Sequence, residues 1–228
     1  MTRIKICGVR EPEHALVAAE VGADFIGVIF APMSSRQVTP EQARDVGAAL
    51  LGRYPQGPRP LLVGVFVNER PEIMEQVADF CGLDLLQLSG DEPWRLCSDL
   101  ARPVIKALRV PEDRDPADLA AELDRELPKV LHGGGHCLLE SHVAGRYGGT
   151  GQQLNWALGS AIAQRFPCLL SGGLNPENIA EALRQVRPWG VDVSSGVETN
   201  GIKDPEKIQA FIHAVKSYDG ALSTRETG

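Results

Sequence analysis

The sequence predicts a single-domain (β/α)8 barrel, and three observations lead to this prediction. Short apolar runs alternate with helix-like segments along almost the whole chain. Eight of these runs are apolar on both faces, as is typical of parallel strands covered by helices. The length of 228 residues suits one such domain, and no linker or second core is apparent. An open doubly wound sheet is the main alternative, but that fold rarely reaches eight regular units without an antiparallel edge strand.

The predicted strands are short, and most of them are followed by glycine or by polar residues. They are IKIC (4–7), DFIGVIF (24–30), LLVGVFV (61–67), LDLLQL (83–88), PVIKAL (103–108), HCLLE (136–140), PCLLSG (167–172) and GVDVSS (190–195). Strict alternation of eight strands with helices favours a closed barrel. We therefore expect the barrel to occupy residues 1–217 and the segment 218–228 to be a frayed tail.

Helix start signals stand between these strands. Several segments place proline in the first turn after Asn, Asp or Thr, with acidic residues following, as helix N-termini prefer. The predicted helical segments are 11–23, 39–50, 70–82, 92–101, 116–127, 175–186 and 204–216. The glycine-rich segment 129–136 is predicted to be a loop, and its two histidines are expected to be solvent-exposed.

Composition narrows the possible partners. The net charge of −7 argues against a nucleic-acid or anionic-membrane surface, because both need clustered lysine and arginine. No apolar run approaches the ~18 residues that span a bilayer. The five cysteines are scattered and lack CxxC spacing, which suits reduced thiols in a cytoplasmic protein better than disulfides or a metal site.

Charged side chains are expected inside the barrel at strands 4–7 and 190–195. Since neighbours along a strand point to opposite faces, Lys5 and Cys7 face inward when Ile4 and Ile6 face the helices. The same alternation turns Asp192 inward, and the first and last strands are neighbours in a closed barrel. Lys5 and Asp192 can therefore form a buried ion pair below Cys7, with either a functional or a purely structural role.

Cys7 and Glu140 both stand at the C-terminal ends of predicted strands, where active sites of this fold lie. A thiol and a carboxyl that face one cavity can divide proton transfer between them, one removing and one donating a proton. Each signal is weak alone, because a single cysteine near a strand end is usually a packing residue.

Two glycine- and serine-rich stretches, SGGLNPEN (171–178) and SSGVE (194–198), follow the last two strands. Their backbone N–H groups can converge on an anion, helped by a short helix beginning near Ser195. Barrels often bind substrate phosphate at this place. The predicted phosphate-binding residues are Gly172, Gly173, Ser194, Ser195 and Gly196.

Two further loops are candidates for substrate contact. APMSSRQVTP (31–40) holds Arg36, whose planar fork suits a carboxylate, although exposed arginines are usually only solvated. YGGTGQQLNW (147–156) is either a flexible lid or an ordinary surface loop.

Taken in order, KICGVR, SSRQVTP, LLVGVFVNE, LDLLQLSGDE, YGGTG, LSGGLNPENI and VDVSSGVE resemble phosphoribosylanthranilate isomerases of tryptophan biosynthesis. The resemblance covers about residues 3 to 216, and KICG together with SGGLNPEN and DVSSGVE is its most specific part. It implies an Amadori rearrangement of N-(5-phosphoribosyl)anthranilate, a small phosphorylated sugar-amine, by a monomer or homodimer without metal or organic cofactor.

By the same resemblance, Cys7 is the general base and the strand-end carboxylate, Glu140, is the general acid. Arg36 matches the residue near the anthranilate carboxylate, and Lys5 and Asp192 are added as candidate substrate-binding side chains. The base must be biased toward thiolate, for which Lys5 is the candidate source, and the acid must keep its proton near neutrality.

Two positions depart from the family pattern. Glu140 stands where the family normally has Asp, so its carboxyl is displaced by ~1.5 Å. Ser89 replaces the usual His and is interpreted as a residue that only lines the site. The remaining alternatives are a histidine-pathway aldose–ketose isomerase, a dual-substrate enzyme, and a barrel that binds a phosphorylated ligand without turnover.

Overall fold

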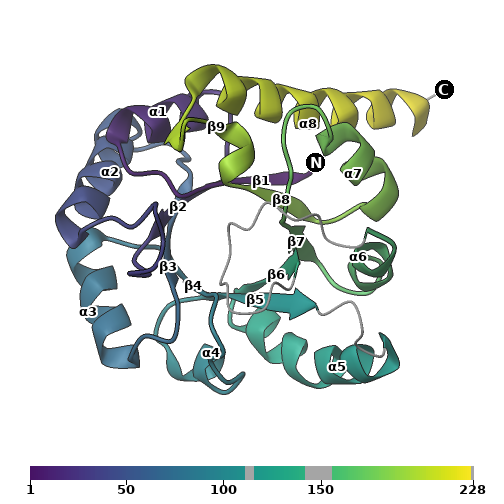
Figure 1. Ribbon diagram of the computed structural model, residues 1–228, viewed down its shortest axis with the longest axis horizontal. Coiled ribbons are helices and arrows are strands. Elements are labelled where there is room, and N and C mark those ends of the chain that lie inside the picture. The colour runs from purple at the N-terminus through teal and green to yellow at the C-terminus, as the bar shows by residue number, and fades with distance from the viewer. Residues whose placement is uncertain (111–115, 142–155, 227–228) are drawn as a thin grey trace.

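The computed structural model describes residues 1–110, 116–141 and 156–226. Its eight long strands pair in parallel and in chain order, and β8 pairs with β1 to close the barrel (Figure 1). The strands are β1 (Arg3–Cys7), β2 (Phe25–Ile29), β3 (Leu61–Phe66), β4 (Leu85–Leu88), β5 (Val104–Val110), β6 (His136–Ser141), β7 (Cys168–Leu170) and β8 (Gly190–Val193). Each overlaps a predicted strand, so the predicted fold class is confirmed.

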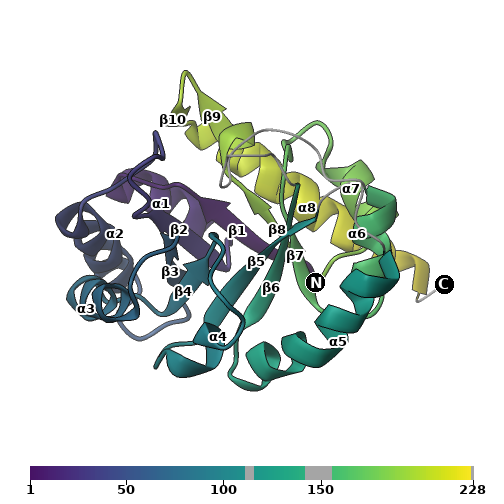
Figure 2. The ribbon, with the colours of Figure 1, turned by 60° about the horizontal axis from the view of Figure 1, so that its bottom comes forward.

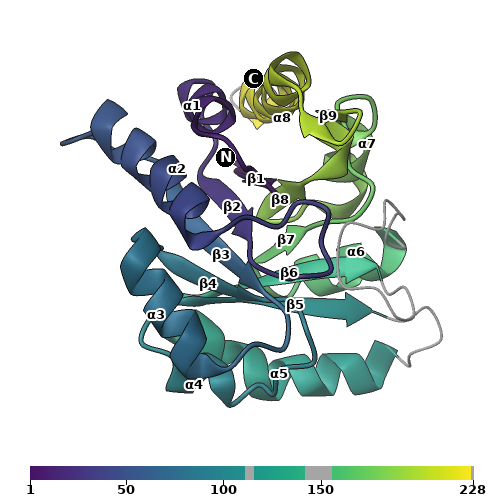
Figure 3. The ribbon, with the colours of Figure 1, turned by 60° about the vertical axis from the view of Figure 1, so that its left-hand side comes forward.

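The helices form the outer layer of the barrel (Figures 1 and 3). They are α1 (Pro12–Glu20), α2 (Pro40–Arg53), α3 (Pro71–Cys81), α4 (Leu96–Asp99), α5 (Pro116–His132), α6 (Trp156–Ala163), α7 (Ile179–Val186) and α8 (Pro205–Glu226). Helix α2 begins with a capping box between Thr39 and Gln42. Among the described residues, no helix combines the length and the apolar character needed to cross a bilayer.

Several helical predictions differ from the structure: α6 is not among the predicted helices, and α7 begins at Ile179 rather than at residue 175. The segment 92–101 is helical only over α4, because its turn is closed by i→i−3 hydrogen bonds, which seldom propagate. Of the segment 129–136, which is predicted to be a loop, only residues 133–135 form one. Helix α5 continues through Pro128 to His132, which is exposed as expected, and β6 starts at His136, whose half-buried ring stacks on Trp189. Helix α8 extends beyond residue 217 to Glu226, where a frayed tail is expected.

The core has two parts, separated by the sheet. Inside the barrel, apolar side chains fill the lower layers: Phe25, Val63, Leu85, Ile105, Ala107, Leu138 and Leu169. A larger apolar cluster lies between the sheet and the helices and includes Ile4 and Ile6. This packing confirms the alternation predicted for β1 and leaves polar inward residues to gather at the C-terminal ends of the strands.

Two short elements follow β8 before the last helix. A 3-10 helix, η1 (Ser195–Val197), confirms the short helix predicted near Ser195. A two-stranded hairpin, β9 (Glu198–Thr199) and β10 (Ile202–Lys203), then rises beyond the barrel (Figure 2). This hairpin is not predicted from the sequence, although its Asn200-Gly201 tip is a characteristic hairpin turn.

Candidate active site

A cavity of about 520 Å³ opens at the C-terminal ends of the strands. This volume is within the range of about 300–1,000 Å³ that is usual for small-molecule sites. The predicted site residues that line it are Cys7, Arg36, Glu140, Gly172, Gly173, Asp192, Ser194, Ser195 and Gly196. The fold therefore brings together side chains from both ends of the sequence, as the barrel prediction requires.

The buried ion pair predicted between Lys5 and Asp192 is present below this cavity. The two residues are register partners on β1 and β8, and Lys5 Nζ lies 2.8 Å from Asp192 Oδ1. Lys5 is 0% exposed, so it lies beneath the cavity wall rather than in it. Burial by itself lowers the pKa of Lys5, but the negative charges of Asp192 and Cys7 outweigh burial and raise it. Removing one partner of such a pair costs about 3–5 kcal/mol of stability.

A glycine in β2 makes room for this arrangement. Gly27 pairs in register with Cys7, and a Cβ atom there would lie 2.8 Å from Cys7 Sγ and 3.1 Å from Lys5 Nζ. Any side chain at this position would push the thiol or the ammonium group away. Lys5 and Cys7 can thus share the space next to β2 because residue 27 is glycine.

The environment of Cys7 only partly fits the expected bias toward thiolate. Burial raises the pKa of the Cys7 thiol, and Asp192 raises it further. Lys5 and Lys203 act in the predicted direction and lower it, but the net result lies above the ordinary value. Lys5 therefore acts as expected, but the expected net bias of Cys7 toward thiolate is wrong, because desolvation of the thiolate is the larger effect.

A raised pKa has a measurable consequence for alkylation. Because only the thiolate reacts, we expect iodoacetamide to modify Cys7 at a rate that rises about tenfold per pH unit and is half-maximal above pH ~8.5, the value of a free thiol. Peptide-resolved mass spectrometry between pH 6 and pH 10 measures this rate. A midpoint below that of free cysteine would contradict the assignment and indicate an activated thiolate in the unliganded protein.

Glu140 occupies the inward-facing position above Leu138 at the end of β6 and is 8% exposed. Its register partner on β5 is Arg109, whose guanidinium contacts Asp91. Arg109 is not among the predicted site residues, although inward-facing Ile105 and Ala107 on the same strand give the alternation that points to it.

The two glycine-rich loops after β7 and β8 face the same cavity. Within the described part of the chain, the N–H groups of Gly172 and Gly173 make no hydrogen bond and remain available as donors. Asn178 holds the first loop, since its Nδ2 donates to the Gly173 carbonyl over 2.9 Å. This support is not predicted from the sequence. The feature that could have indicated it is the Asn-Pro-Glu-Asn segment, in which the side-chain Oδ1 atoms of Asn175 and Asn178 each accept a hydrogen bond from the other residue's backbone N–H.

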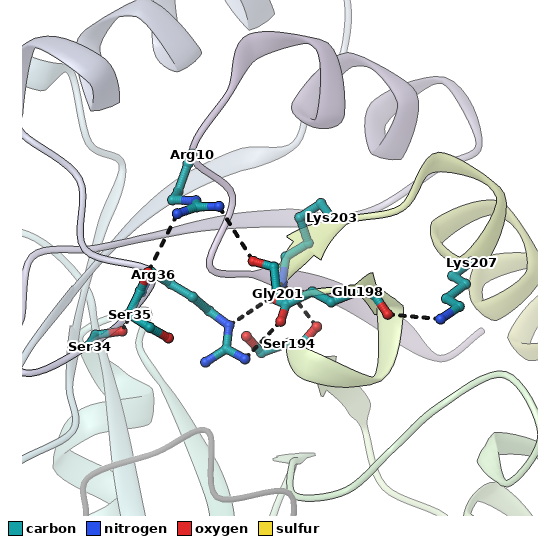
Figure 4. A network of polar contacts seen from close by, with 9 residues as sticks. All are labelled: Arg10, Ser34, Ser35, Arg36, Ser194, Glu198, Gly201, Lys203 and Lys207. Atoms are coloured by element: carbon teal, nitrogen blue, oxygen red, sulfur yellow. Dashed lines mark hydrogen bonds and ion pairs between the residues drawn. The ribbon is translucent and has the colours of Figure 1, made fainter.

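Arg36 reaches the cavity from the loop between β2 and α2, and it already has a carboxylate partner. Its Nε and Nη2 donate to Glu198 over 2.6 and 2.8 Å, and the hydrogen bond to Glu198 raises the Arg36 pKa (Figure 4). Its side-chain stem crosses Gly8, where a Cβ atom would lie 2.6 Å from Arg36 Cδ. Gly8 also has φ of +75°, so the glycine of KICG is required both by its backbone and by Arg36.

Two more polar residues line the cavity from β4 and the residue after it. Ser89 is a lining residue, as predicted, and it accepts a hydrogen bond from Gln87 Nε2 over 3.0 Å. The other amide atom of Gln87, Oε1, is buried without a hydrogen-bond partner in the described structure. Gln87 was not predicted as a site residue. The predicted lid falls almost entirely in residues 142–155, which lie outside the described residues.

Comparison with known proteins agrees with this geometry. The family model described as N-(5'-phosphoribosyl)anthranilate (PRA) isomerase matches residues 4–214. The N-(5'-phosphoribosyl)anthranilate isomerase of Roseiflexus sp. is 46% identical, over 95% of this chain and 99% of its own. That of Dehalococcoides mccartyi is 43% identical, over 96% and 98%.

Solved structures show the same relationship. The phosphoribosyl anthranilate isomerase of Thermotoga maritima superposes with a TM-score of 0.79 and 39% identity, covering 95% of this chain and 100% of that one. A second such isomerase, solved in complex with reduced 1-(o-carboxyphenylamino)-1-deoxyribulose 5-phosphate, gives a TM-score of 0.76 and 38% identity over the same shares. With its barrel, its cavity and these relatives, the chain belongs to the N-(5'-phosphoribosyl)anthranilate isomerase family.

Proposed function

We propose that the protein converts N-(5-phosphoribosyl)anthranilate to 1-(2-carboxyphenylamino)-1-deoxyribulose 5-phosphate in this cavity, with Cys7 as general base and Glu140 as general acid. The observation that carries the proposal is that a thiol and a carboxyl from β1 and β6 line one cavity together with Arg36 and two glycine-rich loops. This is the reaction of the family in tryptophan biosynthesis, and the proposal gives each of these groups a part in it.

The reaction needs two proton transfers. Glu140 donates a proton to the ribose ring oxygen as the bond from that oxygen to C1 breaks, which leaves a protonated Schiff base between C1 and the anthranilate nitrogen. The Cys7 thiolate then removes the proton from C2, and the electron pair moves through C1 to this nitrogen. The resulting enolamine tautomerises to the ketone. The substrate's own nitrogen is the electron sink, so the reaction calls for no cofactor.

The ends of the substrate suit the two other parts of the site. The proposed phosphate-binding residues are Gly172, Gly173, Ser194, Ser195 and Gly196, because backbone N–H groups of adjacent loops are suited to a dianion. Arg36 is the proposed partner of the anthranilate carboxylate. Asp192 lines the cavity next to Cys7, whereas Lys5 acts through Asp192 and Cys7 from below. We further propose a cytoplasmic monomer or homodimer without a nucleic-acid or membrane partner.

Purified protein tests the activity directly. We expect it to accelerate the decay of the fluorescence of N-(5-phosphoribosyl)anthranilate and to form the ketose product in equal amount. Absence of turnover, with the substrate still bound, would instead favour a barrel that only binds the phosphorylated ligand. Turnover of a histidine-pathway aldose in the same preparation would indicate a dual-substrate enzyme.

A further inference from the structure

The β9–β10 hairpin carries a charged pair to the wall of the cavity. Its antiparallel register sets Glu198 opposite Lys203, and Lys203 Nζ lies 2.5 Å from Glu198 Oε1. Lys203 Nζ also donates to the carbonyl of Ser194, a residue that lines the cavity, over 2.9 Å. The Lys203 side chain is only 2% exposed, so this cation is held in place rather than solvated.

The hairpin is anchored to the loops around the first strand. Arg10 donates to the Ser35 and Gly201 carbonyls, and Lys207 donates to the Glu198 carbonyl from the start of α8 (Figure 4). These contacts join the loop after β1, the loop that carries Arg36, and the hairpin tip. Side chains from the loop after β1 and from α8 therefore hold the backbone of the hairpin that carries Glu198.

Glu198 engages only one edge of the Arg36 guanidinium. It accepts from Nε and Nη2, and the side chains of Arg36 and Glu198 are 15% and 6% exposed. Arginine has five N–H donors in one plane, so two bonds to Glu198 leave three donors on Nη1 and Nη2. Arg36 lines the cavity and Glu198 does not, which places the carboxylate behind the guanidinium as seen from the cavity.

Arg36 and Lys203 both form ion pairs with the Glu198 carboxylate, so these three side chains together carry one excess positive charge. Burial alone would raise the pKa of Glu198, but hydrogen bonds from Arg36 and Lys203 lower it, so Glu198 stays ionised near neutrality. A guanidinium held on one edge by an ionised carboxylate loses little further rotamer freedom when its second edge binds an anion.

We propose that Glu198 is a positioning residue that holds the Nε–Nη2 edge of Arg36 so that its remaining N–H donors face the carboxylate of the substrate. Glu198 thereby sets the preference of the enzyme for an arylamine that carries a carboxylate. This inference rests on the proposed role of Arg36, and it adds a residue from the opposite end of the chain to substrate selection.

The test compares two substrates, the glycosylamines formed by ribose 5-phosphate with anthranilate and with aniline, which lacks the carboxylate. Glu198→Gln keeps the side-chain shape but places an amide donor against the guanidinium. We expect kcat/KM for the anthranilate substrate to fall about 10- to 100-fold, mainly through KM, as for lost hydrogen bonds to charged groups. We expect kcat/KM for the aniline substrate to stay unchanged, with product formation followed by chromatography.

Arg36→Met and the double variant separate this inference from the function on which it rests. If Glu198 acts through Arg36, adding Glu198→Gln to Arg36→Met causes no further loss. If Arg36→Met leaves the preference between the substrates intact, the role of Arg36 is wrong and the role of Glu198 with it. If Arg36→Met abolishes the preference and Glu198→Gln does not, only the role of Glu198 is wrong.

The matched control is Glu181→Gln, which removes one charge from the exposed ion pair with Arg184 on α7. This variant should leave kcat/KM for both substrates unchanged. A purely structural role of Glu198 would lower turnover of both substrates alike and lower the melting temperature, and this result would overturn the proposal. Should Glu198→Gln fail to fold, Glu198→Asp keeps the charge but withdraws the carboxylate by ~1.5 Å. An undiminished preference for the anthranilate substrate in Glu198→Asp would then count against the proposal.

Discussion

Replacing Cys7 with serine is expected to lower kcat by about 10²–10⁴-fold, the usual contribution of a general base. Serine fits the same space next to Gly27, but its hydroxyl does not ionise near neutral pH. KM is expected to change little, because Arg36 and the glycine-rich loops are the proposed binding groups. Steady-state measurements of the fluorescence decay of N-(5-phosphoribosyl)anthranilate give both constants.

A second cysteine provides the control for this substitution. Cys97 lies on α4, is partly exposed and is not among the residues that line the cavity, so Cys97→Ser should retain full activity. Because the pKa of Cys7 is raised, the fraction of Cys7 present as the active thiolate increases as pH rises toward that pKa, so wild type and variant must be compared at the same pH. An unchanged kcat in Cys7→Ser would show that another group removes the C2 proton.

Replacing Glu140 with glutamine is expected to cause a loss of similar size, about 10²–10⁴-fold in kcat. The amide keeps the volume of the side chain above Leu138 but has no acidic proton to give to the ring oxygen. Binding should again be largely preserved, so the loss should appear in kcat rather than in KM. Comparable activity of Glu140→Gln and wild type would contradict the assignment of the acid.

The Glu140→Asp substitution tests whether the position of the carboxyl group depends on the length of the glutamate side chain. The change restores the residue that is usual in the family but withdraws the carboxyl by ~1.5 Å. Because a displacement of about 1 Å can cost about 10²-fold in rate, we expect Glu140→Asp to be slower than wild type while remaining faster than Glu140→Gln. Equal or greater activity of Glu140→Asp would show that the position of the carboxyl is not tuned to glutamate.

Much of the fold follows from local patterns. All eight strands could be predicted because each is an apolar run with glycine or polar residues near its end, and proline marked several helix starts. The errors lie where local signals conflict with packing. The glycine-rich segment 129–136 was predicted to be a loop, yet α5 continues to His132, and buried Val130 shows that this last helical turn packs against the core.

The site was predictable to the extent that it depends on strand alternation. Lys5, Cys7, Glu140 and Asp192 point inward because inward and outward positions alternate along β1, β6 and β8. Closure of the barrel made β1 and β8 neighbours, and the ion pair of Lys5 with Asp192 followed from that closure.

Residues on loops could not be placed in this way. Arg36 and Glu198 are 162 positions apart, and their pairing depends on the conformations of two loops and a hairpin that no sequence period describes. The net shift of the Cys7 pKa also depends on how completely the thiol is buried, which no single strand reveals.

The sequence by itself thus determined the barrel, the inward direction of Cys7 and Glu140, and the place of the glycine-rich loops, because these depend on short periods and chain order. Only the tertiary structure decided that Gly27 makes room for Lys5 and Cys7 and that burial outweighs the charge of Lys5 at the thiol. The tertiary structure also paired Arg36 with Glu198. Such features depend on distances and desolvation between segments far apart in the chain, which arise only when the barrel closes.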